Sequence, residues 1–333
     1  YDSAGVLQWT YSTPWDTSNN WLGTISTDVI GNSYITSGSV AAIQKVKPDG
    51  SMAWSANGGS MDEYWTIAFN CNQTKLMVGG TRLDPDSLAL SHGVIFEIDT
   101  SNGNIDTLVN VCNIKYYYPV YWPYWPYPNE VRAMSSTRDN KYYFLTLDSL
   151  GAIKQDTSTG LFLKSMAGVS STYDFSYKTE NYRPITGNAG IRAIRANNNF
   201  LYTQKGDTID KRSLTDGSII KSAAIPGGIS THISSTVYHQ TGNNGIAVDS
   251  CGNVYVGSTG KVIKYDADLN IISEAALPFA VYDVIVVPGG NIVVCGGTGT
   301  NSSTSRTGYL QSVNMSACVP FALGCCNAGI FPV

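Results

Sequence analysis

The stretch Gly252-Asn253-Val254-Tyr255-Val256-Gly257 shows the pattern that decides the fold of this chain. Two turn-forming residues lead into a short run rich in β-branched and aromatic side chains, which is typical of a tight turn followed by a strand. An apolar segment, residues 246–248, comes just before the turn. Strand, tight turn and strand together predict a β-hairpin.

The same hairpin pattern recurs six times along the chain. Its turn position lies at residues 32, 74, 140, 199, 253 and 291, so the successive spacings are 42, 66, 59, 54 and 38 residues. A second hairpin follows each of the first five, as at residues 262–265 and 271–272 on either side of Asp268. Units of about 40 to 50 residues with four strands are typical of propeller blades, and the longer spacings require insertions.

The sequence therefore predicts an all-β fold, a six-bladed β-propeller of four-stranded antiparallel blades. The expected blades lie near residues 22–57, 62–112, 130–168, 188–226, 243–278 and 280–316. The alternative is a pair of separate β-domains divided between Lys115 and Glu130.

The two ends of the repeat region complement each other. The sixth unit has only three strands, the last of them at residues 309–315, whereas residues 6–10 resemble the end of a second hairpin. We expect residues 6–10 to be the fourth strand of the last blade, because closure pairs edges that would otherwise be exposed. Residues 317–333 form a Cys- and Pro-rich tail that we expect to lead to a following domain.

The composition limits the classes of partner. Charged residues make up only 14% of the 333 residues, 43% are apolar, 21 are tyrosines, and the formal net charge is −4. Phosphate-based binding of nucleic acid needs clustered Lys and Arg, which the chain lacks, so we expect no nucleic-acid partner. No apolar run approaches the roughly 20 residues of a membrane-spanning helix, so we expect no membrane insertion.

The cysteines indicate an oxidising setting. Low charge, abundant Ser, Thr and Asn, and several disulfide candidates are typical of an extracellular protein. Cys251 and Cys295 lie at strand positions, where a buried free thiol is the simpler interpretation, and we prefer it for Cys295. No Cys-x-x-Cys spacing is present and no His lies close to a Cys in the sequence, so no metal site is predicted. The disulfide candidates are Cys71 and Cys112, at opposite ends of the second blade, and Cys318, Cys325 and Cys326 in the tail.

One segment stands apart from the repeats. Residues 116–128 combine four prolines with many aromatic residues, and the prolines keep the segment out of helices and central strands. Such a loop can stack on sugar rings, dock on a protein, or cover a propeller face as a hydrophobic lid, and the sequence leaves the interface and the lid open. The candidate binding residues of this aromatic-proline loop are Tyr116, Tyr117, Tyr118, Tyr121, Trp122, Tyr124, Trp125 and Tyr127.

No catalytic constellation is evident in the sequence. His232 and His239 lie in a Ser/Thr-rich stretch without a nearby carboxylate, and there is no nucleophile elbow or phosphate-binding loop. We therefore predict no catalytic residues and no cofactor. Propeller enzymes assemble their sites from separate blades, so a secreted carbohydrate-active enzyme, a lyase or hydrolase with its site at the central channel, is the alternative. Such an enzyme should gather His, Arg, Tyr or carboxylates at the channel.

Two of the repeat units resemble a known kind of protein. Residues 249–257 and 264–270 are similar to propeller repeats of very large secreted surface proteins of Bacteroidetes, which often carry a gliding-motility-associated C-terminal region and are exported by the type 9 system. The resemblance implies a non-catalytic adhesin or appendage component on the cell surface. Its implied partners are other domains of the same or neighbouring chains, and surface glycans.

Overall fold

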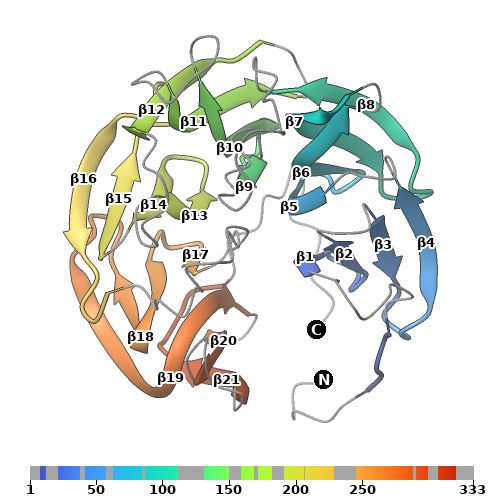
Figure 1. Cartoon of the computed structure of the whole chain (residues 1–333). Helices are drawn as coiled ribbons and strands as arrows, with labels where there is room; N and C mark the ends of the chain where they lie inside the picture. Colours follow the sequence, from blue (N-terminus) through green and yellow to red (C-terminus); the bar gives the residue numbers. More distant parts are fainter. Residues whose placement is uncertain are drawn as a thin grey trace.

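The computed structural model describes residues 8–12, 22–37, 42–57, 63–84, 87–111, 131–149, 159–168, 172–181, 191–205, 207–228, 245–287, 290–298 and 307–319. These residues form antiparallel sheets that follow one another around a disc, with the first strands β1, β5, β9, β13 and β17 nearest its centre (Figure 1). No helix in this part of the chain is long and apolar enough to cross a membrane.

Four sheets have four strands each, in chain order from the centre outward. The first has β1 (Leu22–Thr27), β2 (Ser33–Ser37), β3 (Ala42–Val46) and β4 (Met52–Asn57). The second has β5 (Glu63–Phe69), β6 (Lys75–Asp84), β7 (Ser87–Asp99) and β8 (Ile105–Asn110). The third has β9 (Val131–Ser136), β10 (Lys141–Ser149), β11 (Thr159–Ala167) and β12 (Phe175–Asn181). The fourth has β13 (Ile191–Ala196), β14 (Leu201–Lys205), β15 (Thr208–Arg212) and β16 (Ile219–Ala224).

The last sheet differs from the others and corrects the predicted blade count. It has five strands, β17 (Ile246–Val248), β18 (Val254–Tyr265), β19 (Ile271–Val286), β20 (Asn291–Thr298) and β21 (Thr307–Asn314). The structure thus has five blades, and the prediction of six is wrong. Residues assigned to the fifth and sixth blades share one sheet, because β19 pairs with β18 through its first half and with β20 through its second half.

The predicted hairpin turns form at the repeated positions. Gly31 and Gly252 have φ angles of 87° and 84°, a left-handed conformation in which other residues are strained, and their amides close turns on the carbonyls of Asp28 and Asp249. At the corresponding turn of the third blade, Asn140 takes a φ of 58°, which asparagine tolerates better than most residues. The local sequence therefore sets the position of each hairpin.

The hydrophobic core is divided among the spaces between neighbouring sheets. Tyr34 and Trp54 of the first sheet pack with Tyr64 and Phe96 of the second, and further apolar clusters join the second to the third, the third to the fourth and the fourth to the last. Another cluster lies within the last sheet, where Tyr255 meets side chains of β19 and β20. Each sheet is thus held mainly by the faces of its neighbours.

The N-terminal segment does not form the expected closing strand in the described residues. Of residues 6–10, the structure describes 8–10, and these carry no strand. Trp9 instead lies on the first blade, where its Nε1 donates to the carbonyl of Pro48 at 2.7 Å. Within the described chain, the only sheet partner of β21 is β20.

Candidate functional site

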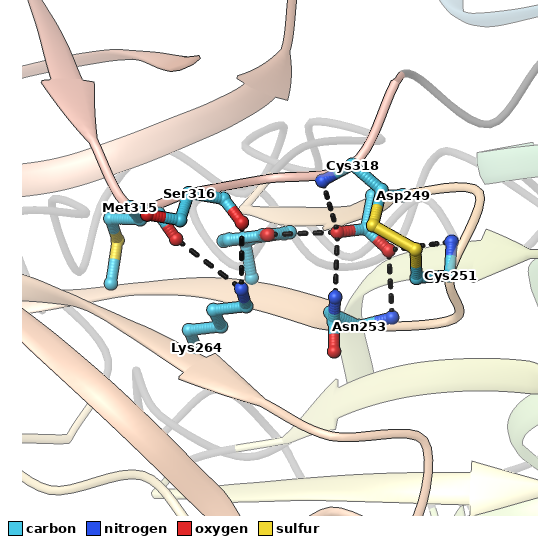
Figure 2. Close-up of a disulfide and its surroundings, with 8 residues drawn as sticks. Asp249, Cys251, Asn253, Lys264, Met315, Ser316 and Cys318 are labelled. Carbon is cyan, nitrogen blue, oxygen red and sulfur yellow. Dashed lines mark hydrogen bonds between the residues drawn. A yellow bond between two sulfur atoms is a disulfide. The ribbon is translucent and has the colours of Figure 1, made fainter. Parts of the chain in front are cut away.

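The turn before β18 is built around one buried carboxylate. Asp249 Oδ1 accepts from the backbone amides of Cys251 and Asn253 at 3.0 and 2.9 Å. Its Oδ2 accepts from Asn253 Nδ2 at 2.8 Å, from the Tyr255 hydroxyl at 2.9 Å and from the Cys318 amide at 3.0 Å (Figure 2). Five donors on a fully buried carboxylate satisfy its charge and fix the turn.

A disulfide fastens the chain beyond β21 to this turn. Cys251 and Cys318 are bonded, with their Cα atoms 5.9 Å apart, and Figure 2 shows the bond beside Asp249. The Ser250 amide also donates to the carbonyl of Val319 at 2.9 Å, and Lys264 Nζ donates to the Ser316 carbonyl at 3.1 Å. The disulfide therefore belongs to a corner where the chain after β21 is held through backbone, side-chain and covalent contacts.

This corner does not fit a metal ion. Ligand atoms of Asp249, Cys251 and Cys318 lie within 4.8 Å of one another. Both sulfur atoms are in the disulfide, however, and the carboxylate already accepts five hydrogen bonds. The arrangement is that of a structural staple.

The structure places the other cysteines in different environments. Cys71 is disulfide-bonded, and its partner lies outside the described residues, as do the candidates Cys112, Cys325 and Cys326. The Cys295 thiol is free, and burial together with the charge of Asp283 raises its pKa to about 11. Cys251 was not among the predicted disulfide residues, because nothing in the local sequence shows that its turn lies beside Cys318.

A polar group lies beside β13 and β17, two of the strands nearest the centre of the disc (Figure 1). Arg195 on β13 donates through Nε to the Ile246 carbonyl on β17 at 3.3 Å. Asp283 on β19 accepts from the amides of Gly245 and Val284 at 3.3 and 2.6 Å, and Cys295 lies opposite it in the β19–β20 pairing. We call Arg195, Asp283 and Cys295 the inner-strand group.

Two members of the inner-strand group, Asp283 and Arg195, have shifted pKa values. Burial raises the pKa of Asp283, and the positive charge of Arg195 together with the two amide donors opposes that rise. Burial lowers the pKa of Arg195, and Asp283 opposes that shift. A guanidinium and a carboxylate with raised pKa near the centre of a propeller are the residue types that the enzyme alternative requires.

An apolar patch lies on the outer strands. Ile219 and Ile220 on β16 are 49% and 54% exposed, and Ile271 and Ile272 on β19 are 48% and 52% exposed. Lys221 Nζ donates to Asn270 Oδ1 at 3.2 Å, so the two strands that carry these isoleucine pairs are neighbours. We call these four isoleucines the outer-rim patch. No binding role was predicted for these isoleucines, although two Ile-Ile pairs that each follow a predicted turn were a visible signal in the sequence.

The aromatic-proline loop, residues 116–128, lies outside the described residues, and so do His232 and His239.

Comparisons with solved structures agree with the geometry above. The chain is a β-propeller. It is similar to a streptogramin B lyase, with a TM-score of 0.54 and 12% identity over 88% of this chain and 83% of that one. It is also similar to the WD40 β-propeller domain of Doa1, with a TM-score of 0.51 and 12% identity over 90% and 84% of the two chains.

A third similar structure is the calcium-binding protein regucalcin from Agrobacterium tumefaciens, with a TM-score of 0.51 and 13% identity over 90% of this propeller and 92% of regucalcin. At these identities the likeness shows the fold alone, because unrelated functions share this architecture. No family model and no curated protein sequence matches this propeller.

Proposed function

We propose that this propeller is a non-catalytic extracellular module of a large secreted surface protein, of the Bacteroidetes kind that its repeats resemble, and that it mediates adhesion or assembly through protein or glycan contacts. The observation that carries the proposal is the outer-rim patch. Four half-exposed isoleucines from two sheets exceed the singly scattered apolar residues of an ordinary surface, and exposed apolar patches mark contact sites.

The chemistry of the patch favours a protein partner at this position. Aliphatic side chains offer neither the ring faces nor the hydrogen bonds that sugars need, whereas they pack well against apolar side chains. The aromatic-proline loop has the residue types for sugar contacts, and we assign any glycan binding to its tyrosines and tryptophans.

The disulfide supports the extracellular part of the proposal. Disulfides persist in oxidising compartments and are rare in the cytosol. Cys251–Cys318 holds a corner that no described helix or further sheet covers, where a covalent bond is useful.

Binding of the purified propeller to intact cells of the producing organism tests the proposal. The double variant Ile220→Lys/Ile272→Lys should lose most cell binding while its melting temperature stays near that of the wild type. The matched control is Ala224→Lys/Ala276→Lys, which adds the same charge to exposed positions on the same two strands. Equal binding of both variants and the wild type would exclude the outer-rim patch, and replacing Tyr121, Trp122, Tyr124 and Trp125 with Ala then tests the loop.

The inner-strand group supports a second candidate function, a secreted carbohydrate-active enzyme with its site at the centre of the disc. A carboxyl group with a raised pKa suits general-acid chemistry, and Asp283 would have that role with Arg195 as a positive neighbour. A panel of polysaccharides, assayed for new reducing ends and for the absorbance of unsaturated products, tests it. Loss of activity in Asp283→Asn, but not in Asp266→Asn at an exposed turn, supports the enzyme; absence of cleavage by the wild type rejects it.

A further inference from the structure

Arg195 and Asp283 come from different sheets, and both reach the start of β17. Arg195 Nε donates to the carbonyl of Ile246 at 3.3 Å, and Asp283 Oδ1 accepts from the amides of Gly245 and Val284. In the part of the chain that the structure describes, no ion pair joins the two side chains, and the Nη atoms of Arg195 and Oδ2 of Asp283 have no hydrogen-bond partner. Each charged group is therefore anchored through one atom and keeps its other polar atoms free.

The two charges lie close together without pairing. Each opposes the effect of burial on the pKa of the other, which requires them to be near each other. Both side chains are partly exposed, and none of their free polar atoms is buried. A bound molecule that places an acceptor on the guanidinium and a donor on the carboxylate would satisfy both groups at once.

Tyr282 adds an exposed ring next to this pair. It is the extra residue of a β-bulge between Val281 and Asp283. The side chain is 43% exposed, and a Cβ on Gly297 would stand 3.2 Å from its ring, so the glycine leaves room for it. Successive side chains of a regular strand point to opposite faces, and a bulge breaks this alternation. Neighbouring residues at a bulge, here Tyr282 and Asp283, can therefore contact the same ligand.

The chemistry of the three groups suits an acidic sugar. A guanidinium with two free Nη atoms binds a carboxylate through two parallel hydrogen bonds, and a carboxylate accepts hydrogen bonds from sugar hydroxyls. An exposed tyrosine ring offers a flat apolar surface to a sugar ring. A phosphate or sulfate ion would meet the like charge of Asp283 without offering it a hydroxyl, and a neutral sugar would leave Arg195 without an anion.

We propose that Arg195, Tyr282 and Asp283 bind a hexuronic acid unit of a polysaccharide. Its carboxylate lies on Arg195, one of its hydroxyls donates to Asp283, and its ring packs on Tyr282. The site is that of the second candidate function, on which the inference rests for its position, and the inference adds the class of substrate.

Calorimetric titration of the whole chain tests the ligand class. The probes are trimers of galacturonic, glucuronic and mannuronic acid, each compared with the neutral trimer that has a hydroxymethyl group in place of the carboxylate. At least one acidic trimer should bind more tightly than its neutral counterpart by about 10-fold, because a charge-assisted pair replaces a neutral contact. Absence of binding by every acidic trimer, or equal binding of the neutral ones, would overturn the proposal.

Variants locate the binding. Arg195→Gln should weaken binding of the acidic trimer about 10- to 100-fold, and Arg195→Lys should weaken it less because the charge remains while the fork of two donors is lost. Tyr282→Ala, which removes an exposed side chain, should weaken binding about 2- to 10-fold. The matched control is Lys261→Gln, which removes one positive charge from an ion pair with Glu274.

Melting temperatures near that of the wild type show that each variant is folded. If Arg195→Gln and Tyr282→Ala bind as the wild type does, or if Lys261→Gln weakens binding as much as Arg195→Gln, the proposed site is wrong.

Cleavage measured in the same mixtures separates this inference from the function on which it rests. Binding of an acidic trimer without new reducing ends or unsaturated products supports the site and rejects the enzyme. Cleavage of neutral polysaccharides alone, lost in Asp283→Asn, supports the enzyme and overturns the acidic ligand.

Discussion

Two turns of this propeller have the same local design and different surroundings. In both, one aspartate accepts from two backbone amides, an asparagine side chain and a tyrosine hydroxyl: Asp28 with Asn32 and Tyr34, and Asp249 with Asn253 and Tyr255. Only Asp249 accepts a fifth hydrogen bond, from Cys318, and only its turn carries the disulfide. The comparison shows that the repeat sequence is enough to form the turn. Contacts with the chain beyond β21 are added at only one of these two turns, the one at Asp249.

The largest expected loss of stability follows replacement of Asp249, and it should exceed the loss at Asp28. Asp249→Ala leaves several buried donors without an acceptor and should lower the free energy of unfolding by about 4 kcal/mol. Asp28→Ala should cost about half as much, since Asp28 is only partly buried and has one donor fewer. Denaturant unfolding of both variants measures the difference. Equal losses would show that the Cys318 contact adds nothing to the Asp249 turn.

Removal of the disulfide should have the next largest effect. The bond closes a loop of 67 residues, for which restriction of the unfolded chain gives at most about 4 kcal/mol, and about 2 to 4 kcal/mol is the expected loss for Cys251→Ser/Cys318→Ser. Thermal unfolding of the variant and of the wild type measures it, without reductant because reductant would also cleave the disulfide of Cys71. Cys295→Ser is the matched control, because that thiol is free, and it should lower the melting temperature much less than the double variant.

The two tyrosines refine the comparison further. Tyr255→Phe and Tyr34→Phe each remove one hydrogen bond to a carboxylate and should each cost about 1 to 2 kcal/mol. In both cases burial and the neighbouring aspartate raise the pKa of the tyrosine. Ultraviolet difference spectra of wild type and variants during alkaline titration should show that these two hydroxyls ionise only on unfolding. Ionisation of either one in the folded protein would contradict the hydrogen-bonded geometry.

The turn at Asp266 should show the smallest effect on stability. Asp266 accepts from the amides of Asp268 and Asn270 and from Asn270 Nδ2, without a tyrosine and at an exposed position. The hydrogen bonds from Asn270 are the main cause of a lowered pKa at Asp266. Because the folded-state pKa lies below the unfolded one, this contribution to stability is present above the ordinary aspartate pKa and is lost as the pH falls through the folded value.

Asn270→Ala should therefore move the pKa of Asp266 toward its ordinary value. Carboxyl chemical shifts followed by NMR measure the change, and Asp216, whose lowered pKa comes first from Ser218, is an internal control that should not move. An unchanged titration of Asp266 would show that the side-chain amide is not a cause.

The hairpins were predictable because each depends on neighbours in the sequence. Gly252 and Asn253 set the turn, and the alternation that follows sets the strand. The number of blades was not predictable in the same way. Leu277 and Phe279 were expected to lie at a boundary, yet β19 runs through them and joins two predicted blades in one sheet. Strand continuity depends on which faces pack together, and Phe279 and Val281 pack against Tyr255.

The candidate site was predicted less well than the fold. Cys318 was recognised as a disulfide candidate, but its partner Cys251 lies 67 residues away, and their meeting depends on how the sheets are arranged around the disc. The inner-strand group was not predictable for the same reason, since Arg195 and Asp283 come from different sheets and meet across β17. No short sequence window contains both members of either pair.

The sequence by itself determined the hairpin repeat, its turns and the β-propeller architecture, because backbone conformation and the alternation of apolar residues act over a few neighbouring positions. Only the tertiary structure decided which turns became neighbours. It placed Cys318 on the Asp249 turn, Trp9 on the Pro48 turn and β16 beside the start of β19. The physical reason is that packing between sheets joins residues far apart in the chain, and no local pattern records which faces will meet.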